Sequence, residues 1–281
     1  SPDIIFANPA TELIINLGNL ADTFTMDSVD AGFAADLTIN DTGGIDSLDT
    51  PNALNIAGDI TSADIENIDI DNTFTSTSLT ATTGITTFNS SGFTITTTGA
   101  ADAVGGAVSV TTTGALITGD INALGGTSTG VGRAGGAVTL DAGTSTLSVG
   151  AIDTSGSAAA GASGLAGGAA GQIDLDADTS VTLGGNLTSV GGAGDGAGNG
   201  GDGAGLSFND AVVLGATVDL DTRGGAGAAA GTDGGITFLA GATIEATTAF
   251  TEGLTVRGGA IDFNDVVGGT NALGAVVITY S

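Results

Sequence analysis

The chain has 281 residues, with 31 acidic side chains against three basic ones, and its formal net charge is −28 at pH 7. It contains 51 glycines and no cysteine, histidine or tryptophan, and its only cations are Arg133, Arg223 and Arg257. Three scattered arginines cannot form the cationic face that nucleic acids or anionic membrane surfaces require. Disulfides, thiolate zinc sites and histidine-dependent catalysis are excluded by composition. These counts favour a structural chain over an enzyme.

Hydropathy and charge together indicate a folded, exported protein. Hydrophobic residues make up 41% of the chain, whereas disorder combines high charge with low hydrophobicity. No apolar run approaches the roughly 18 residues of a membrane-spanning helix, so we expect no membrane insertion. No leader is visible at Ser1, so we expect a signal peptide to be absent or already removed. An aspartate-rich, lysine-free surface suits salty surroundings that screen its charge, and we expect a secreted protein of the bacterial or archaeal cell surface.

Residues 1–100 are predicted to form an irregular N-terminal β region. Alternating apolar segments predict strands at residues 13–17, 37–40, 54–56, 68–71 and 93–97, separated by Asp, Asn, Thr and Gly turns. All three prolines lie here, which suits edges and corners because proline cannot donate a ladder hydrogen bond. We interpret this region as the atypical start of the repeat array that follows, with a separate β domain as the alternative.

Residues 101–281 contain a repeat in which glycine precedes alternating apolar residues. Its copies are GGAVSV (105–110), GGAVTL (135–140), GQIDL (171–175), GLSF (205–208), GGITF (234–238) and GGAIDF (258–263). A second apolar alternation and then a Gly-, Ala- and Ser-rich stretch follow, as at 155–171 and 191–205. Short β-branched segments without helical periodicity predict an all-β fold. The expected architecture is a right-handed parallel β-helix, a β-solenoid of about 25–35 residues per coil with the Gly-rich stretches as loops.

Stacking of coils about 4.8 Å apart would align equivalent residues in columns. The two inward columns of this register are entirely apolar, and they consist of Val108, Val138, Ile173, Leu206, Ile236 and Ile261, then Val110, Leu140, Leu175, Phe208, Phe238 and Phe263. The three consecutive phenylalanines are expected to stack inside the rod. In the outward column between them, serine or threonine separates the aspartates, which weakens the repulsion between carboxylates.

The units GGAVSVTTTGALITGDINALGG and GGAVTLDAGTSTLSVGAIDTSGS resemble the degenerate repeats of filamentous-haemagglutinin-like proteins. Those proteins are large repetitive surface adhesins of bacteria with a β-solenoid fold. The resemblance covers residues 75–281 and implies an exported, non-enzymatic rod. The secretion domain of that family has no visible counterpart here, which leaves the export route open.

Aspartates two residues apart on one strand face are the candidate metal ligands. They are Asp174, Asp176 and Asp178, then Asp219 and Asp221, and the register also places Asp141 beside Asp176. Carboxylates at this spacing can share Ca²⁺, which prefers hard oxygen ligands. The Gly-rich calcium-binding repeat is only echoed at GGIDSL (43–48). We favour a solvated anionic surface, so no cofactor is required and calcium is the one candidate.

Other chemistries fit the residues less well. Parallel β-helices often cleave polysaccharides, but their clefts use cationic and aromatic side chains that this chain largely lacks. The Gly-rich stretches lack the lysine and the helix that follow a phosphate loop. The threonine runs lack the regular ladder of a flat ice-binding face.

The two ends of the chain are compatible with two structural roles. Residues 3–9 and 274–281 are apolar, extended in character and without a capping helix. Uncapped ends that pair between subunits make a contact that does not close. We predict a non-enzymatic extracellular structural protein that assembles head to tail through its terminal strands into a cell-surface or matrix filament. The alternative is a stalk or ligand-binding segment of a giant calcium-dependent adhesin, in contact with a surface or a polysaccharide.

Overall fold

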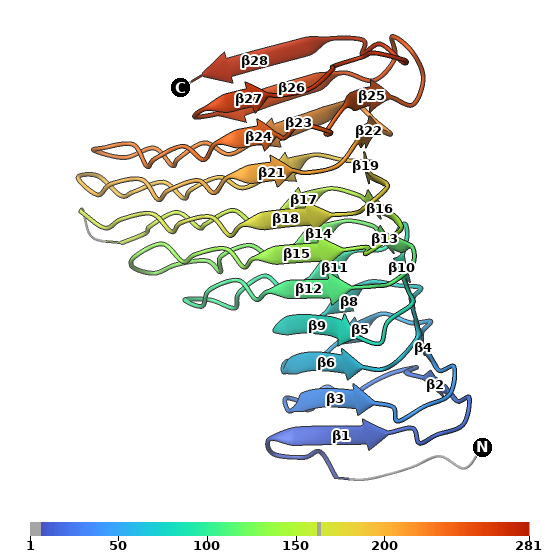
Figure 1. Cartoon of the computed structure of the whole chain (residues 1–281). Coiled ribbons are helices and arrows are strands. Elements are labelled where there is room, and N and C mark those ends of the chain that lie inside the picture. Colours follow the sequence, from blue (N-terminus) through green and yellow to red (C-terminus); the bar gives the residue numbers. More distant parts are fainter. Residues whose placement is uncertain (1–6, 162–163, 281) are drawn as a thin grey trace.

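The computed structural model describes residues 7–161 and 164–280 and shows a parallel β-helix made of three long sheets (Figure 1). Successive coils stack along one axis, and strands that follow one another in a sheet come from successive coils. Every strand pair in these sheets is parallel, and no helix occurs among the described residues. The all-β solenoid expected from the sequence is therefore confirmed.

Each of the three sheets is a stack of short strands, neighbour beside neighbour along the rod. Sheet A consists of β1 (Glu12–Asn16), β3 (Asp36–Asn40), β6 (Asp59–Ala63), β9 (Ser78–Thr83), β12 (Val108–Thr111), β15 (Val138–Asp141), β18 (Ile173–Asp176), β21 (Leu206–Phe208), β24 (Ile236–Phe238) and β27 (Ile261–Phe263). Sheet B consists of β2 (Thr23–Thr25), β4 (Ser47–Thr50), β7 (Asn67–Ile70), β10 (Thr87–Ser90), β13 (Leu116–Thr118), β16 (Thr146–Val149), β19 (Ser180–Leu183), β22 (Val212–Leu214) and β25 (Ile244–Ala246). Sheet C consists of β5 (Leu54–Asn55), β8 (Phe74–Thr75), β11 (Ile95–Thr96), β14 (Ile121–Asn122), β17 (Ile152–Asp153), β20 (Leu187–Thr188), β23 (Val218–Asp221), β26 (Leu254–Gly258) and β28 (Val276–Tyr280).

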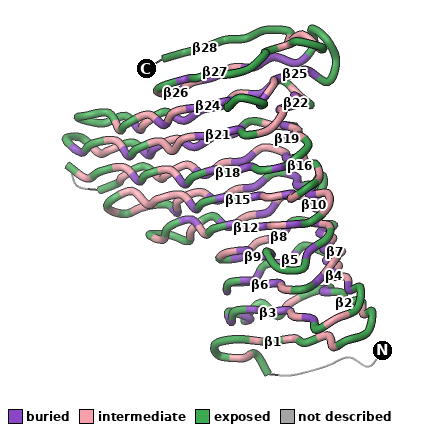
Figure 2. Tube along the Cα trace, viewed as in Figure 1, coloured by how far each residue is buried: buried purple, intermediate pink, exposed green. Residues whose placement is uncertain are grey.

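The core is a set of apolar columns that run along the rod axis (Figure 2). Both predicted inward columns of sheet A form in the predicted register, from Val108 opposite Val138 to Phe238 opposite Phe263. The phenylalanine rings stack at centroid distances of 4.8 Å and 5.0 Å and lie within 8° of parallel. Each strand sends every second side chain inward, so the apolar residues at alternate positions fill the interior of the rod.

Coils differ in length because their loops differ, while the strands keep their register. The Ser78 hydroxyl donates to Asp59, 19 residues earlier, whereas the Val190 amide donates to Ser155, 35 residues earlier. The short coils lie in the first hundred residues, where no Gly-rich insertion occurs. The same three sheets run through that region and through residues 101–281.

The Gly-rich stretches form a hydrogen-bonded projection beside sheet A (Figure 1). We call this projection the fin; it consists of residues 123–137, 154–161, 164–172, 189–205 and 222–235. Amides three residues apart donate to the next coil, as Gly132 and Gly135 do to Ala166 and Ala169 at 2.8 Å and 3.0 Å. The amides of the fin are thus satisfied between coils and not within a helical turn.

Glycine is required in the fin because neighbouring backbones approach too closely for a side chain. A Cβ atom at Gly201 would lie 2.0 Å from the carbonyl oxygen of Gly168. The base of the fin is closed by hydroxyls that are almost fully buried. Thr154 and Thr222 donate to the carbonyl oxygens of Gly171 and Gly234 at 2.7 Å. The Gly-rich stretches, which were expected to be simple loops, therefore form a second hydrogen-bonded arrangement beside the three sheets.

Candidate functional site

The six predicted metal ligands fall into two groups on different sheets. Asp174 and Asp176 lie on β18, Asp141 ends β15, and Asp178 follows β18 at the corner that leads to sheet B. Asp219 and Asp221 lie on β23 of sheet C. The two groups are therefore separate candidate sites and not one.

The first group contains the predicted carboxylate pair. Asp141 and Asp176 are register partners of adjacent strands, as expected. Burial raises the pKa of Asp176, and the carboxyl groups of Asp210 and Asp141 raise it further. Asp210 also accepts a hydrogen bond from the Ala177 amide at 3.3 Å. The sequence did not indicate this third acid, because Asp210 lies one residue beyond the position that is in register with Asp141 and Asp176.

The other two acids of this group lie apart from the pair. Asp174 lies on the outer face of β18 between Thr139 and Ser207, so hydroxyl residues separate it from the nearest acid of its column. The Asp178 amide donates to the carbonyl oxygen of Gly143 at 3.0 Å, while its exposed side chain faces solvent. The charge spacing predicted for this column is confirmed.

In the second group, both aspartates form ion pairs with arginines. Arg257 contacts the Asp219 carboxylate at 2.7 Å, and Arg223 binds Asp221 through both Nε and Nη2, with a shortest distance of 2.6 Å. Burial alone would raise the pKa of Asp221, but the hydrogen bonds and positive charge of Arg223 hold it below its usual range. These carboxylates already have cationic partners, so they offer less to a metal ion than the pair on sheet A does.

In the part of the chain that the structure describes, the acidic side chains form pairs and no larger set of metal ligands. There, no three or more acidic side chains converge as metal ligands. Asp141 and Asp176 with Asp210 therefore remain an anionic ladder on the outer surface of the rod, and calcium binding by the predicted residues stays a prediction.

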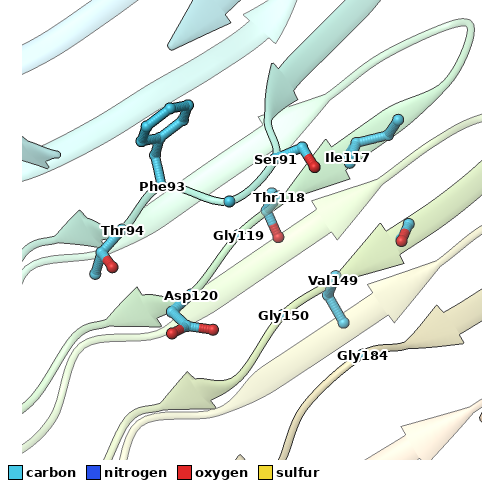
Figure 3. Close-up of a pocket in the computed structure, with 12 residues that line it drawn as sticks. Ser91, Phe93, Thr94, Ile117, Thr118, Gly119, Asp120, Val149, Gly150 and Gly184 are labelled. Carbon is cyan, nitrogen blue, oxygen red and sulfur yellow. The ribbon is translucent and has the colours of Figure 1, made fainter. Parts of the chain in front are cut away.

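A shallow groove lies at the corner between sheets B and C (Figure 3). Its lining is mostly Gly, Ser and Thr, with Phe93 and Ile117 as its large apolar side chains and Asp120 as its carboxylate. Asp120 accepts a hydrogen bond from the Ala151 amide at 2.8 Å, which fixes it as part of the corner. The groove holds one acid, and general acid–base hydrolysis of a glycoside uses two carboxyl groups facing each other across the bond.

Comparisons of the chain with protein-family models, with curated proteins and with solved structures gave no match. Among the described residues, no helix has the length and apolar character that crossing a membrane demands.

Proposed function

We propose that this chain is a non-enzymatic, extracellular structural protein that assembles head to tail into a filament. The observation that carries the proposal is that, among the described residues, the apolar columns of the core end at β1 and β28 without a further strand over them. Val276 and Ile278 continue the columns of Leu254 and Val256, yet they are 45% and 44% exposed. At the other end, Leu13 and Ile15 continue the columns of Leu37 and Ile39.

Another coil is the natural cover for such an end. The first or last strand of a second copy can add to this stack in parallel, because β1 and β28 each pair with one neighbour only among the described residues. Contact between two different surfaces of the same molecule is heterologous and extends without closing, which produces a fibre. Residues 3–6 of the apolar segment expected to donate a strand lie outside the described residues, so the proposal rests on β1 and β28 alone.

Charge and composition support the extracellular and non-enzymatic parts of the proposal. A net charge of −28 on an open rod repels other copies, and salt at the cell surface would screen this repulsion enough for ends to meet. The chain has no histidine or cysteine to act as a nucleophile, acid or base. Its outer surface consists of β positions, corners and the fin, with the groove of Figure 3 as a polar depression.

The filament is tested with charged substitutions at the open end. The purified full chain, at high protein concentration and 0.5 M NaCl (about the ionic strength of seawater), is expected to form rods in electron micrographs. Val276→Lys and Ile278→Lys place charges in the column that a second copy would cover, and should abolish the rods. Ile117→Lys, on the flank of sheet B, is the matched control and should retain them. Strictly monomeric wild-type protein in light scattering would contradict the proposal.

The second candidate is a segment of a large adhesin. The resemblance of residues 75–281 to adhesin repeats favours it, since further coils of a longer chain would cover the same open columns. The mass of the native protein separates the two roles. A mass near 26.5 kDa favours a filament subunit, and a much larger mass favours the adhesin.

A further inference from the structure

Two buried aspartates lie at the corner between β3 and β4, within the sequence DTGGID (41–46). Asp41 is 5% exposed and Asp46 is fully buried. Aspartate is rarely buried to this extent without a charged partner. The only arginines are Arg133, Arg223 and Arg257, and the ion pairs of these three are with Asp102, Asp219 and Asp221. The corner therefore concentrates negative charge with no side-chain cation to balance it.

One oxygen of each carboxylate is held by backbone amides. The Gly43 amide donates to Asp41 Oδ2 at 2.5 Å, and the Asp22 amide of the preceding coil donates to Asp46 Oδ1 at 2.6 Å. Glu66 of the following coil accepts from the Asp46 amide at 2.8 Å. Three successive coils thus fix the two carboxylates in place.

The second oxygen of each carboxylate has no such partner. Asp41 Oδ1 and Asp46 Oδ2 are buried, and no hydrogen-bond donor reaches either of them from the described residues. The two carboxyl groups nevertheless lie within hydrogen-bonding reach of each other. Two buried, unpaired carboxylate oxygens this close are costly unless a proton or a cation lies between them.

The backbone of Gly44 lies close to Asp46 Oδ2 and to the preceding coil, with no room for a side chain. A Cβ atom at this position would lie 2.9 Å from Asp46 Oδ2 and 2.6 Å from the carbonyl oxygen of Leu20. The φ angle of Gly44 is +149°, which also favours glycine. A carboxylate oxygen from one coil and a backbone carbonyl from the coil before it therefore both lie close to Gly44.

We propose that this corner binds one Ca²⁺ ion between Asp41 Oδ1 and Asp46 Oδ2. Ca²⁺ accepts carboxylate and carbonyl oxygens in irregular arrangements, and the Leu20 carbonyl supplies a further oxygen at the same corner. Mg²⁺ fits less well, because it keeps most of its water and demands near-octahedral geometry. The ion balances the charge of the two aspartates and ties the first coil to the second. The site does not depend on filament assembly.

The test is calcium titration of the full chain under conditions in which it is monomeric. After treatment with EDTA, CaCl₂ is added and binding is followed by calorimetry and by the melting temperature. We expect one stoichiometric site and a rise in melting temperature of about 5 °C at a hundredfold excess over the dissociation constant. MgCl₂ at the same concentration should give a much smaller shift.

Substitutions locate the ion. Asp41→Asn and Asp46→Asn keep the shape of each side chain and should each lower calcium affinity at least tenfold and remove the thermal shift. Asp176→Asn, in the carboxylate pair on sheet A, is the matched control and should leave the titration unchanged. Absence of calcium binding by the wild-type chain would overturn the proposal. So would a titration that survives both corner substitutions, or one that Asp176→Asn abolishes.

If a variant fails to fold, a second measurement on the wild-type chain still tests the proposal. The DTGGID corner should show at least tenfold slower amide hydrogen exchange in calcium than in EDTA, and the β15 to β18 region should show no change. Slowing confined to β15 and β18 would place the ion at the other pair and overturn the proposal.

Discussion

The coils before residue 97 and those after it use the same three sheets but are closed at their corners by different means. The earlier coils turn through short Asp-, Asn- and Thr-rich corners such as DTGGID (41–46). The later coils pass through the fin, where glycine backbones bond directly to one another. A β-helix therefore constrains the strands far more than the corners, since a corner needs only to satisfy its own backbone groups.

The two regions also balance charge differently. In the earlier coils Asp49 and Asp69 are register partners, and no arginine occurs among these residues. In the later coils Asp174 lies between Thr139 and Ser207, and Asp221 is paired with Arg223. The same fold thus contains uncompensated carboxylates at one end and separated or paired ones at the other. Three sets of variants test how much these differences matter.

The largest expected effect comes from the phenylalanine stack of the later coils. Phe238→Ala should destabilise the protein by about 3–5 kcal/mol, because it leaves a cavity between Phe208 and Phe263. Phe88→Ala is the counterpart in the earlier coils, where an equally buried ring has Ile68 and Leu116 as its register partners. Phe238→Ala should cost about 1 kcal/mol more, since stacked rings add to burial. Urea unfolding followed by circular dichroism measures both, and equal losses would deny the stack any contribution of its own.

The fin should show an intermediate effect. Gly201→Ala places a Cβ atom 2.0 Å from a backbone oxygen, so the arms must move apart, and we expect a loss of about 2 kcal/mol. Gly130→Ala is the control within the same fin, because no atom lies within 4 Å of its Cβ position, and its effect should stay within about 0.5 kcal/mol. Hydrogen exchange of the fin amides is the local readout. Unchanged protection in Gly201→Ala would show that the close packing is dispensable.

The smallest expected effect is on the pH dependence of stability, to which Asp49 and Asp221 contribute in opposite ways. Burial and then the charges of Asp71 and Asp69 raise the pKa of Asp49, so its contribution to stability is full at low pH and is lost as the pH rises through the raised pKa. The pKa of Asp221 is lowered, so its contribution is present at neutral pH and is lost as the pH falls below about 4.

Substitution by asparagine should therefore act in opposite directions at neutral pH. Asp49→Asn should raise the melting temperature at pH 7 and leave it nearly unchanged at pH 3. Asp221→Asn should lower it at pH 7, with the difference shrinking toward pH 3. Melting in EDTA at both pH values measures the four differences. The same sign for both variants at pH 7 would show that charge balance does not distinguish the two regions.

The strand register could be predicted from the sequence because it depends on a period of two. Once GGAVSV and GGAVTL are aligned, a slip of one residue would turn Val108 and Val138 outward, so a single register buries both columns. The stacked phenylalanines and the outward column followed from the same alignment. The irregular coils before residue 100 were predicted less completely, because no glycine-led motif marks their strands and their corners vary in length.

The sequence by itself thus determined the fold class, the columns of the core and the excess of negative charge. Only the tertiary structure decided which charges meet, because coils 19 to 36 residues long bring together corners that no fixed spacing relates. It paired Asp221 with Arg223 and Arg257 with Asp219, added Asp210 to the Asp176 ladder and buried Asp41 against Asp46. It also turned the Gly-rich stretches into the fin, since their amides donate to carbonyl oxygens of neighbouring coils, which no local sequence pattern specifies.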